Sequence, residues 1–244
     1  MRIALIGYGK MGRIIEQMGK EDGHEFPLII DLDNQKDLTP EKLSTCDVAI
    51  EFTVPASAPD NIMACFDAGI PVVSGTTGWN DRYREVAEIC LKSNGGLFHA
   101  SNFSIGVNIF MEINRQLAGI MNGFPQYRVE LEEVHHIHKL DAPSGTAITL
   151  AEKIIGEIDR IGQWELTDSN SQDKKPEEEV LPVRALRQGE VKGRHTVSYE
   201  SDLDSITLIH DAKSREAFAS GALMASEFML QKHGIYGMKD LLGL

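Results

Sequence analysis

The sequence predicts an α/β fold of two domains, in which the first domain contains a doubly wound parallel sheet. Residues 1–100 alternate short apolar runs with stretches of helical periodicity, which is typical of successive β-α-β units. After residue 104 the pattern changes to one long helix followed by strands of alternating polarity. A chain of 244 residues is long enough for two domains that each have a core.

The parallel sheet is predicted from five apolar runs. We expect strands at Ile3–Ile6, Phe26–Ile30, Val48–Phe52, Pro71–Ser74 and Gly96–His99. Apolar residues spaced as on one face of a helix occupy the intervals between these runs. We therefore expect helices at Met11–Gly19, Ala56–Ala68 and Asp81–Lys92.

The second domain is predicted from a helix and three strands. Val107–Met121 has the pattern of an amphipathic helix, and Tyr127–His135 alternates apolar with charged residues, as in a half-buried strand. Two more strands, Gly193–Glu200 and Asp204–Asp211, would form an antiparallel pair joined by a tight turn. Helix Thr146–Ile155 would help to cover one face. The predicted domain is therefore α+β, with a mixed or antiparallel sheet.

Two further segments complete the prediction. The acidic stretch 165–179 is expected to be a surface connection. Residues Arg215–Leu230, rich in Ala, Phe, Met and Leu, have the composition of a strong helix.

Composition excludes several classes of function. The formal net charge of −13 argues against nucleic acid or an anionic membrane as partner. We expect a cytoplasmic protein, because the sequence has neither a signal-peptide pattern nor an apolar run long enough for a membrane span. Three dispersed cysteines, Cys46, Cys65 and Cys90, are expected to be reduced core thiols.

A glycine-rich loop predicts dinucleotide binding. Strand Ile3–Ile6 runs directly into G-Y-G-K-M-G at residues 7–12, and a helix follows. This order is that of a Rossmann-type domain, in which the glycines allow a tight turn and close approach of a pyrophosphate to the helix N-terminus. Asp31, at the end of the second strand, suits the hydroxyls of an adenosine ribose. Because Leu32 follows it and not Arg, we expect NADH to be preferred over NADPH; Lys10 and Lys36 are the residues that would reverse this preference.

A second cluster, Gly75-Thr76-Thr77-Gly78, follows the strand Pro71–Ser74. It lies at the carboxyl edge of the predicted sheet, in the crevice where dinucleotides bind. Its hydroxyls and backbone amides suit the nicotinamide ribose or carboxamide. The alternative is an ordinary loop between a strand and a helix.

The segment 132–147 is the most informative about chemistry. His135, His136, His138 and Lys139 lie within five residues in an acidic chain, and a helix begins directly after Pro143. The segment offers proton donors, a cation and a helix N-terminus that binds carboxylates. A zinc site and a solvated basic turn are the alternatives, although no cysteine accompanies the histidines and Lys139 would oppose a metal ion.

The same segment resembles a family signature. Glu133–Ala147 is similar to the E-x-H-H-x-x-K-x-D-A-P-S-G-T-A run of the dihydrodipicolinate reductases. Four further segments resemble that family in the same order along the chain: Gly75–Trp79, Ala100–Asn108, Arg187–Thr196 and Ile209–Arg215. The sequence departs from the family in a glycine loop one residue shorter than in many relatives and in Ser101, where alanine is common.

The resemblance implies a reaction and its residues. A nicotinamide cofactor, NADH or NADPH, would reduce 4-hydroxy-tetrahydrodipicolinate to tetrahydrodipicolinate in the diaminopimelate and lysine pathway. The hydride would reach C4 of the ring after loss of water, and His135 and Lys139 would supply protons. The substrate-binding residues would be His136, Ser144, Gly145 and Thr146. The cofactor-binding residues would be Gly7, Tyr8, Gly9, Lys10, Met11, Gly12, Asp31, Gly75, Thr76, Thr77, Ala100, Ser101, Asn102 and Phe103.

The resemblance also implies the domain organisation. Residues 1–103, completed by the C-terminal segment 215–244, would bind the dinucleotide. Residues 104–214 would bind the small dicarboxylate substrate and form a homotetramer, and no metal is expected. Two other functions are compatible with the glycine loop: another reductase of a small imino or amino acid, such as an aspartate dehydrogenase, and a regulator that senses NADH. Neither needs the run of histidines, and the net charge of −13 argues against a regulator that binds DNA.

Overall fold

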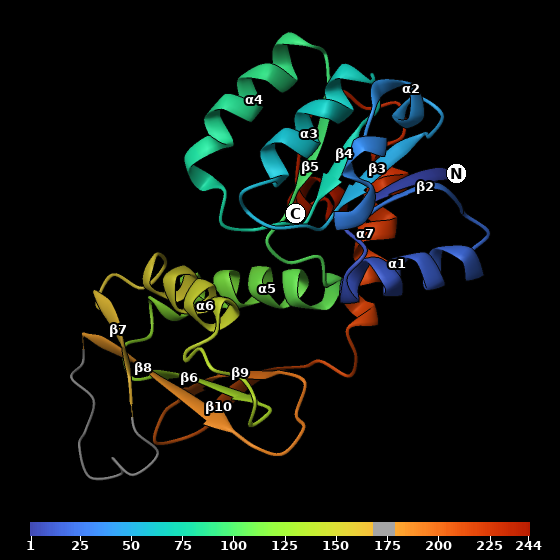
Figure 1. Ribbon diagram of the computed structural model, residues 1–244. Coiled ribbons are helices and arrows are strands. Elements are labelled where there is room, and N and C mark those ends of the chain that lie inside the picture. The colour runs from blue at the N-terminus through green and yellow to red at the C-terminus, as the bar shows by residue number, and fades with distance from the viewer. Residues whose placement is uncertain (168–178) are drawn as a thin grey trace. The chain divides into compact units, whose positions relative to one another are not determined.

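The chain forms two compact units (Figure 1). The computed structural model describes residues 1–167 and 179–244. The first unit consists of Met1–Asn108 and Arg215–Leu244, and the second consists of Ile109–Ser214. The predicted α/β class is confirmed, with a parallel sheet in the first unit and a mixed sheet in the second.

The first unit is built on six parallel strands in the order β11-β5-β4-β3-β1-β2. In chain order the strands are β1 (Arg2–Ile6), β2 (Glu25–Ile30), β3 (Val48–Glu51), β4 (Val72–Ser74), β5 (Gly96–His99) and β11 (Gly234–Tyr236). The helices are α1 (Lys10–Glu21), α2 (Pro40–Leu43), α3 (Ala58–Asp67), α4 (Tyr83–Lys92), α7 (Glu216–Met229) and α8 (Met238–Leu242), with 3-10 turns at Leu32–Asp37 and Asn80–Arg82. The helices predicted for the first 100 residues end within two residues of their observed limits.

Each face of this sheet has its own core. Ala4 and Ile6 pack on one face with α3 and α4, whereas Ile3 and Leu5 pack on the other with α1 and α7 (Figure 1). All four side chains are buried, because successive residues of a strand point to opposite faces. A strand covered on both sides has to be apolar throughout, which is why these strands read as short unbroken apolar runs.

The C-terminal segment completes the first unit. Helix α7 packs against α1 and the sheet, and a Cβ at Gly221 would lie 1.8 Å from the carbonyl oxygen of Phe103, in the segment between β5 and α5. Strand β11 then pairs with β5. The sequence predicted the helix but neither β11 nor α8, because three and five residues are too few to show a period.

The second unit has a five-stranded sheet in the order β10-β9-β6-β8-β7. Its strands are β6 (Arg128–His135), β7 (Gln163–Leu166), β8 (Val180–Arg187), β9 (Arg194–Glu200) and β10 (Ser205–Asp211). Helix α6 (Gly145–Ile155) packs on the sheet, together with the part of α5 (Ile105–Met121) that belongs to this unit. Pairs β6–β9 and β9–β10 are antiparallel, whereas β6–β8 and β7–β8 are parallel. Of the two predicted sheet types, the mixed one is therefore correct.

Strand β8 was missed because it contains Pro182, which usually marks an edge strand or a loop. Pro182 lies opposite Glu165 of β7, and the pairing of β8 with β6 begins one residue later, at Val183. Proline is thus kept outside the central ladder. Of the acidic segment 165–179, residues 168–178 lie outside the described part of the chain. Within the described part, no helix is both long and apolar enough to cross a membrane.

Candidate active site

The carboxylate of Glu133 is the centre of a polar cluster in the second unit. It projects from β6 and is fully buried. The Ser144 backbone N–H donates to both carboxylate oxygens, at 3.1 Å each, and the Arg187 guanidinium lies 3.4 Å from Oε1. A carboxylate out of contact with water needs such donors, because its desolvation is costly. Sequence analysis gave Glu133 no role, and only its place in the signature could have drawn attention to it.

The surroundings of Glu133 favour its ionised form. Burial alone would raise its pKa, but the donors on His195 and Ser144 and the nearby charge at His135 outweigh burial and lower the pKa to about 2. Glu133 therefore carries a negative charge at neutral pH, in a place where the neighbouring groups are basic.

His135 follows Glu133 on the same face of β6. Its Nδ1 lies 3.5 Å from Glu133 Oε2, and the residue is 8% exposed. Burial lowers the pKa of His135 to about 4; the Glu133 carboxylate opposes this shift, whereas His195, Lys139 and Arg187 add to it. His135 is therefore neutral at pH 7, and a second negative charge beside it would raise its pKa.

His195 approaches the cluster from β9, directly opposite Glu133 in the ladder. Its Nε2 lies 3.7 Å from Glu133 Oε2 and 3.3 Å from Ser144 Oγ, and its ring meets that of His135 edge-on at 5.3 Å between centroids. In the sequence, His195 drew attention only as part of Arg187–Thr196, a segment that resembles the reductase family. The place of His195 in the cluster depends on the register of β6 and β9, which brings it opposite Glu133 although the two residues are 62 positions apart in the chain.

The same three groups have the geometry of a possible cation site. One ligand atom each from Glu133, His135 and His195 lies within 4.8 Å of the others. Both carboxylate oxygens already accept the Ser144 N–H, however, and the Arg187 charge lies beside one of them. A metal ion would have to displace these donors. The zinc site that the sequence left open would combine His135 with His136 or His138, and of these histidines only His135 belongs to this group.

Arg187 also organises the loop after β6. It ends β8 opposite His135, and its guanidinium donates to the backbone carbonyls of Lys139 and Asp141. The Lys139 ammonium donates in turn to both oxygens of Asp141, at 2.8 and 2.7 Å. The Lys139 side chain is 20% exposed, whereas that of Asp141 is 63% exposed, so the ammonium lies at the edge of the cluster.

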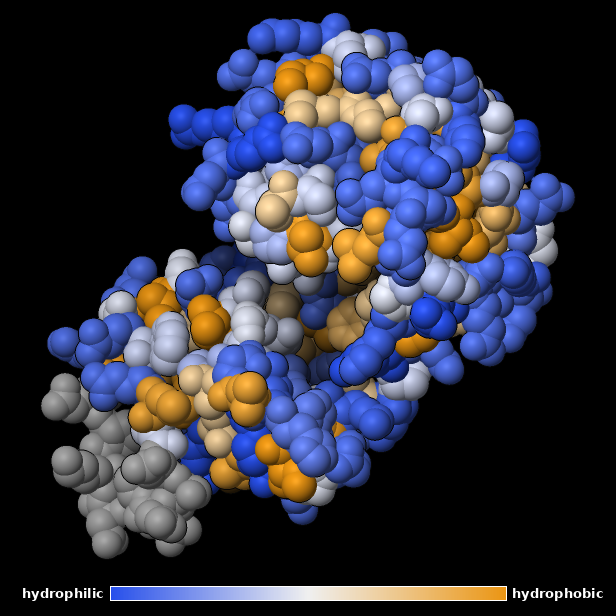
Figure 2. All heavy atoms as spheres, viewed as in Figure 1, coloured by the Kyte–Doolittle hydropathy of each residue, from blue (hydrophilic) through white to orange (hydrophobic). Residues whose placement is uncertain are grey.

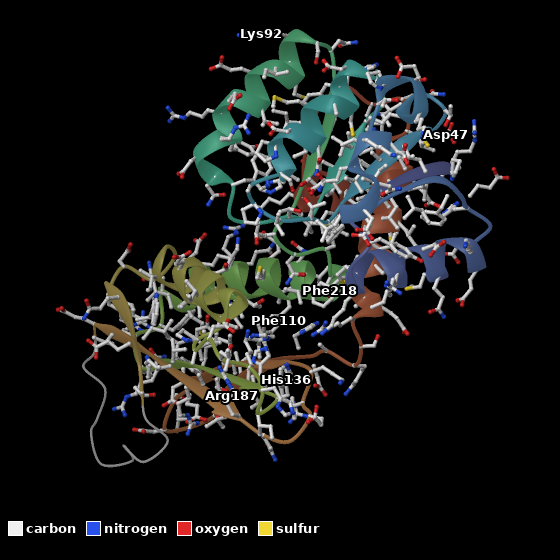
Figure 3. All side chains as sticks on the ribbon, viewed as in Figure 1. Asp47, Lys92, Phe110, His136, Arg187 and Phe218 are labelled. Atoms are coloured by element: carbon white, nitrogen blue, oxygen red, sulfur yellow. The ribbon has the colours of Figure 1, made fainter. Side chains whose placement is uncertain are left out.

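The remaining residues of the histidine segment separate into two groups. His138 is exposed, and its Nε2 lies 3.1 Å from Glu190, so it lies outside the buried cluster. His136 is half-buried, and Figure 3 labels it near Arg187, where β6 and β8 end. Its Nδ1 is buried without a hydrogen-bond partner among the described residues. Such an atom is suited to a ligand.

Helix α6 begins beside Glu133 in the way that the sequence predicted. Ser144 is its N-cap, and the Ser144 hydroxyl accepts the Ala147 N–H at 3.2 Å. A Cβ at Gly145 would meet nothing within 4 Å, so the first turn of the helix is open on that side. Part of its anion-binding capacity is already used, because the Ser144 N–H binds Glu133. The N–H groups of Gly145 and Thr146 are the next along the turn.

In the first unit, the glycine loop has the geometry that a pyrophosphate needs. Gly7 has φ +100°, and a Cβ there would lie 2.0 Å from the Phe52 carbonyl oxygen; at Gly12 it would lie 2.2 Å from the Gly7 oxygen. A Cβ at Gly9, by contrast, would meet nothing within 4 Å, which leaves room for a ligand. Gly9 caps α1, and no side chain among the described residues caps that helix, so its first N–H groups are available to an anion.

A cavity of about 280 Å³ opens beside this loop. Its lining residues are Met11, Phe52, Gly75, Ser101, Asn102, Phe103, Arg215 and Phe218, and Figure 3 labels the last of these. Five of the residues predicted to bind the cofactor therefore meet at one place. Ala100 is buried and does not line the cavity.

Among the predicted cofactor residues, Asp31 and Thr76 already have hydrogen-bond partners within the protein. The Asp31 carboxylate accepts the Leu32 N–H at 2.8 Å, although the residue is exposed. The Thr76 hydroxyl is buried and turned inward, where it donates to Glu51 at 2.8 Å. In the loop Gly75–Gly78, the groups that remain available to a ligand are the exposed side chain of Thr77 and the backbone.

Comparison with known proteins gives consistent matches over the whole chain. Residues 1–103 match the family model described as "Dihydrodipicolinate reductase, N-terminus", and residues 106–242 match the one described as "Dihydrodipicolinate reductase, C-terminus". A protein of Christiangramia forsetii named 4-hydroxy-tetrahydrodipicolinate reductase is 48% identical, over 99% of this chain and 98% of its own. A protein of the same name from Methanopyrus kandleri is 40% identical, over 83% of this chain and 74% of its own.

Among solved structures, a dipicolinate-bound dihydrodipicolinate reductase of a Paenisporosarcina species shares the fold. Its TM-score is 0.79 over 98% of both chains, with 23% sequence identity. An aspartate semialdehyde dehydrogenase of Vibrio cholerae matches with a TM-score of 0.52 and 11% identity, over 94% of this chain and 98% of its own.

Proposed function

This chain belongs to the dihydrodipicolinate reductase family, and we infer that it reduces 4-hydroxy-tetrahydrodipicolinate to tetrahydrodipicolinate with a nicotinamide cofactor. It is an oxidoreductase of lysine biosynthesis by the diaminopimelate route. The observation that carries the inference is the relative that is 48% identical over nearly the full length of both chains. The basic cluster around Glu133 supplies the chemistry that a small dicarboxylate requires.

We propose that the substrate dianion binds between the histidines of β6 and the first turn of α6. Arg187, Lys139 and the N–H groups of Gly145 and Thr146 favour a carboxylate in this place. Lys139 would exchange Asp141 for a substrate carboxylate, and its position at the edge of the cluster makes that exchange accessible. His136 contributes the buried Nδ1 that has no partner among the described residues.

In the proposed mechanism, His135 delivers the proton. Loss of water from the 4-hydroxy substrate would leave a conjugated ring. A reduced nicotinamide bound here would supply hydride to C4 of that ring, and the delocalised anion that remains would take up one proton. The resting His135 is neutral, with its pKa lowered to about 4 by burial. The arriving dianion raises this pKa by adding negative charge, so substrate binding itself favours the acidic form of His135. Lys139 is the second donor.

Glu133 and Gly193 place His135 for this task. The carboxylate lies on the Nδ1 side of the ring and leaves Nε2 to face the substrate. Gly193, with φ +155°, lies against Nε2: a Cβ there would be 3.0 Å from it. Because Gly193 has no side chain, no Cβ at this position crowds the nitrogen.

The cofactor would lie along the carboxyl edge of the parallel sheet. We propose that the glycine loop and the start of α1 bind the pyrophosphate, and that Gly75, Thr76, Thr77, Asn102 and Phe103 contact the nicotinamide half. Asp31 would accept ribose hydroxyls, and its charge would repel a 2′-phosphate. We therefore propose a preference for NADH. The ratio of the NADH and NADPH Michaelis constants tests it.

We also propose a cytoplasmic homotetramer. Strand β10 is an edge strand with exposed apolar side chains at Ile206 and Ile209, and Leu203 lies 95% exposed in the turn before it. An unpaired edge of this kind favours association with another sheet. Figure 2 shows apolar side chains scattered among hydrophilic ones on the visible surface of each unit. Light scattering coupled to size-exclusion chromatography would give the mass of the assembly.

The decisive experiment is a coupled assay. The condensing synthase, with pyruvate and aspartate semialdehyde, generates the unstable substrate in place, and loss of reduced-nicotinamide absorbance is followed after this protein is added. Oxidation that depends on the synthase is expected. If the protein bound NADH but oxidised neither NADH nor NADPH, the role of the glycine loop in dinucleotide binding would stand, and the reductase assignment would be refuted.

A further inference from the structure

A buried acid lies between the two loops proposed to bind the cofactor. Glu51 ends β3 and is 0% exposed. In the sheet it pairs with Ile6 on one side and with Ser74 on the other. Ile6 directly precedes the glycine loop, and Ser74 directly precedes Gly75, so Glu51 is adjacent to the start of both loops.

Every hydrogen bond to the Glu51 carboxylate is donated by a neighbour. Oε1 accepts the Thr53 backbone N–H at 3.0 Å, the Thr76 hydroxyl at 2.8 Å and the Thr53 hydroxyl at shorter range. Oε2 accepts the Ser74 hydroxyl at 2.7 Å. An ionised carboxylate, which only accepts, fits this pattern. Among residues 1–167 and 179–244, no basic side chain forms an ion pair with it.

Such an arrangement is not needed to hold β3 in the sheet. The other three residues of this strand are Val48, Ala49 and Ile50, all of them apolar and buried. A buried acid among them costs free energy until its donors compensate. Replacing a whole hydrogen-bonded group by apolar residues of similar shape is often neutral for stability. Stability therefore does not account for this acid.

The hydrogen bonds of Glu51 connect the loop after β3 with the loop after β4. The Thr76 hydroxyl donates to Glu51 and accepts the Thr53 N–H at 2.8 Å, so one hydroxyl joins the loop after β4 to the loop after β3. Gly75 lies so close to Phe52 that a Cβ would be 2.2 Å from its ring. Phe52 and Gly75 both line the 280 Å³ cavity. Glu51 directly precedes Phe52 and pairs with Ser74, which directly precedes Gly75, so it adjoins two residues of the cavity wall.

We propose that Glu51 is a positioning residue of the cofactor site, which holds the Thr53 and Thr76 loops in one arrangement and places a fixed negative charge beneath the nicotinamide. A negative charge in a site of low dielectric favours the positively charged oxidised ring over the neutral reduced ring. Glu51 therefore favours the cation that forms as hydride leaves. The inference rests on the proposed function in one respect, namely that a nicotinamide occupies this cavity.

The test compares binding of both cofactor forms to full-length variants by isothermal titration calorimetry, without substrate. Glu51→Gln preserves size and removes the charge. It is expected to raise the Kd of NAD⁺ about tenfold and that of NADH only about threefold, because only the oxidised ring is charged. Thr76→Val keeps the Glu51 charge but removes the hydroxyl that joins the two loops, so it is expected to raise the Kd values of NAD⁺ and NADH by the same factor.

Two serines provide a matched control. Ser74→Ala removes one donor to Glu51, whereas Ser226→Ala removes an equally buried hydroxyl that donates only to the Ala222 carbonyl of α7. The first is expected to weaken binding of both cofactor forms, and the second to leave binding unchanged. If Glu51→Gln does not fold, Thr76→Val and Ser74→Ala test whether the hydrogen bonds to Glu51 position the two loops. Glu51→Asp keeps the charge and is then expected to retain the wild-type ratio of the Kd values for NAD⁺ and NADH.

The outcomes separate the inference from the proposed function. Equal changes of both constants in Glu51→Gln would refute the charge effect, and wild-type constants in Glu51→Gln and Thr76→Val would refute the positioning role. If the wild-type protein bound neither NADH nor NADPH, the proposed function itself would fail, and this inference with it.

Discussion

Replacement of Glu133 by glutamine tests how the active-site cluster is held together. The carboxylate pKa is lowered from 4.5 to about 2 in the folded protein, by about 2.5 units. At 1.36 kcal/mol per unit, the ionised form contributes ~3 kcal/mol to the free energy of unfolding. Glutamine keeps the size of the side chain but presents an amide N–H₂ to donors on Ser144 and Arg187. We therefore expect Glu133→Gln to lose about 2–4 kcal/mol at pH 7.

The loss should depend on pH in a defined direction. Because the folded-state pKa of Glu133 lies below the unfolded value, its contribution is complete above pH 4.5 and is lost as the pH falls toward 2. The difference between wild type and variant should therefore be constant from about pH 6 to 8, and it should shrink below about pH 4.5.

Urea unfolding followed by far-ultraviolet circular dichroism, at several pH values and one protein concentration, measures this difference. Glu132→Gln is the matched control: its side chain is 31% exposed and pairs with Arg184 at 3.2 Å, a surface pair worth no more than about 1 kcal/mol. A loss in Glu133→Gln no larger than in the control would refute the reasoning. A difference that stayed constant down to pH 3 would refute the assigned charge.

Three further predictions concern catalysis and cofactor choice. His135→Ala should lower kcat by about 10²–10⁴-fold and leave the calorimetric Kd of NADH unchanged; retention of kcat within a few-fold would make Lys139 the principal donor. Gly193→Ala should lower kcat about tenfold or more, because φ at this position is +155° and the added Cβ would press on His135 Nε2. Gly162→Ala is the control and should leave kcat unchanged, because a Cβ there would meet nothing within 4 Å. Equal kcat values in the two variants would disprove the steric argument. The KM of NADPH should exceed that of NADH. Asp31→Asn should reduce the difference between the two KM values, because it removes the repulsion between the carboxylate and the 2′-phosphate. An NADPH preference in the wild type would refute the predicted NADH preference.

Local patterns were sufficient for much of the first unit. The five strands and the three longer helices of the first 100 residues follow from apolar spacing, because each of these strands is buried on both faces and each of these helices on one. The short helix α2 was not predicted. The glycine loop could also be predicted, since its requirements are met by neighbouring residues: Gly7 needs its positive φ and Gly12 its contact with the Gly7 carbonyl. The short elements β11 and α8 are held by tertiary packing and gave no such signal.

The sequence by itself determined that several groups of the candidate active site lie in one segment: the histidines, Lys139 and the helix start at Ser144. Only the tertiary structure decided what those groups are next to. Glu133 meets His195 through the register of β6 and β9, and it meets Arg187 through β8, the strand that Pro182 concealed. The physical reason is that pKa depends on burial and on charges within a few ångströms, and those are set by contacts between residues far apart in the chain. Spacing along a sequence carries no information about such contacts until the strands pair.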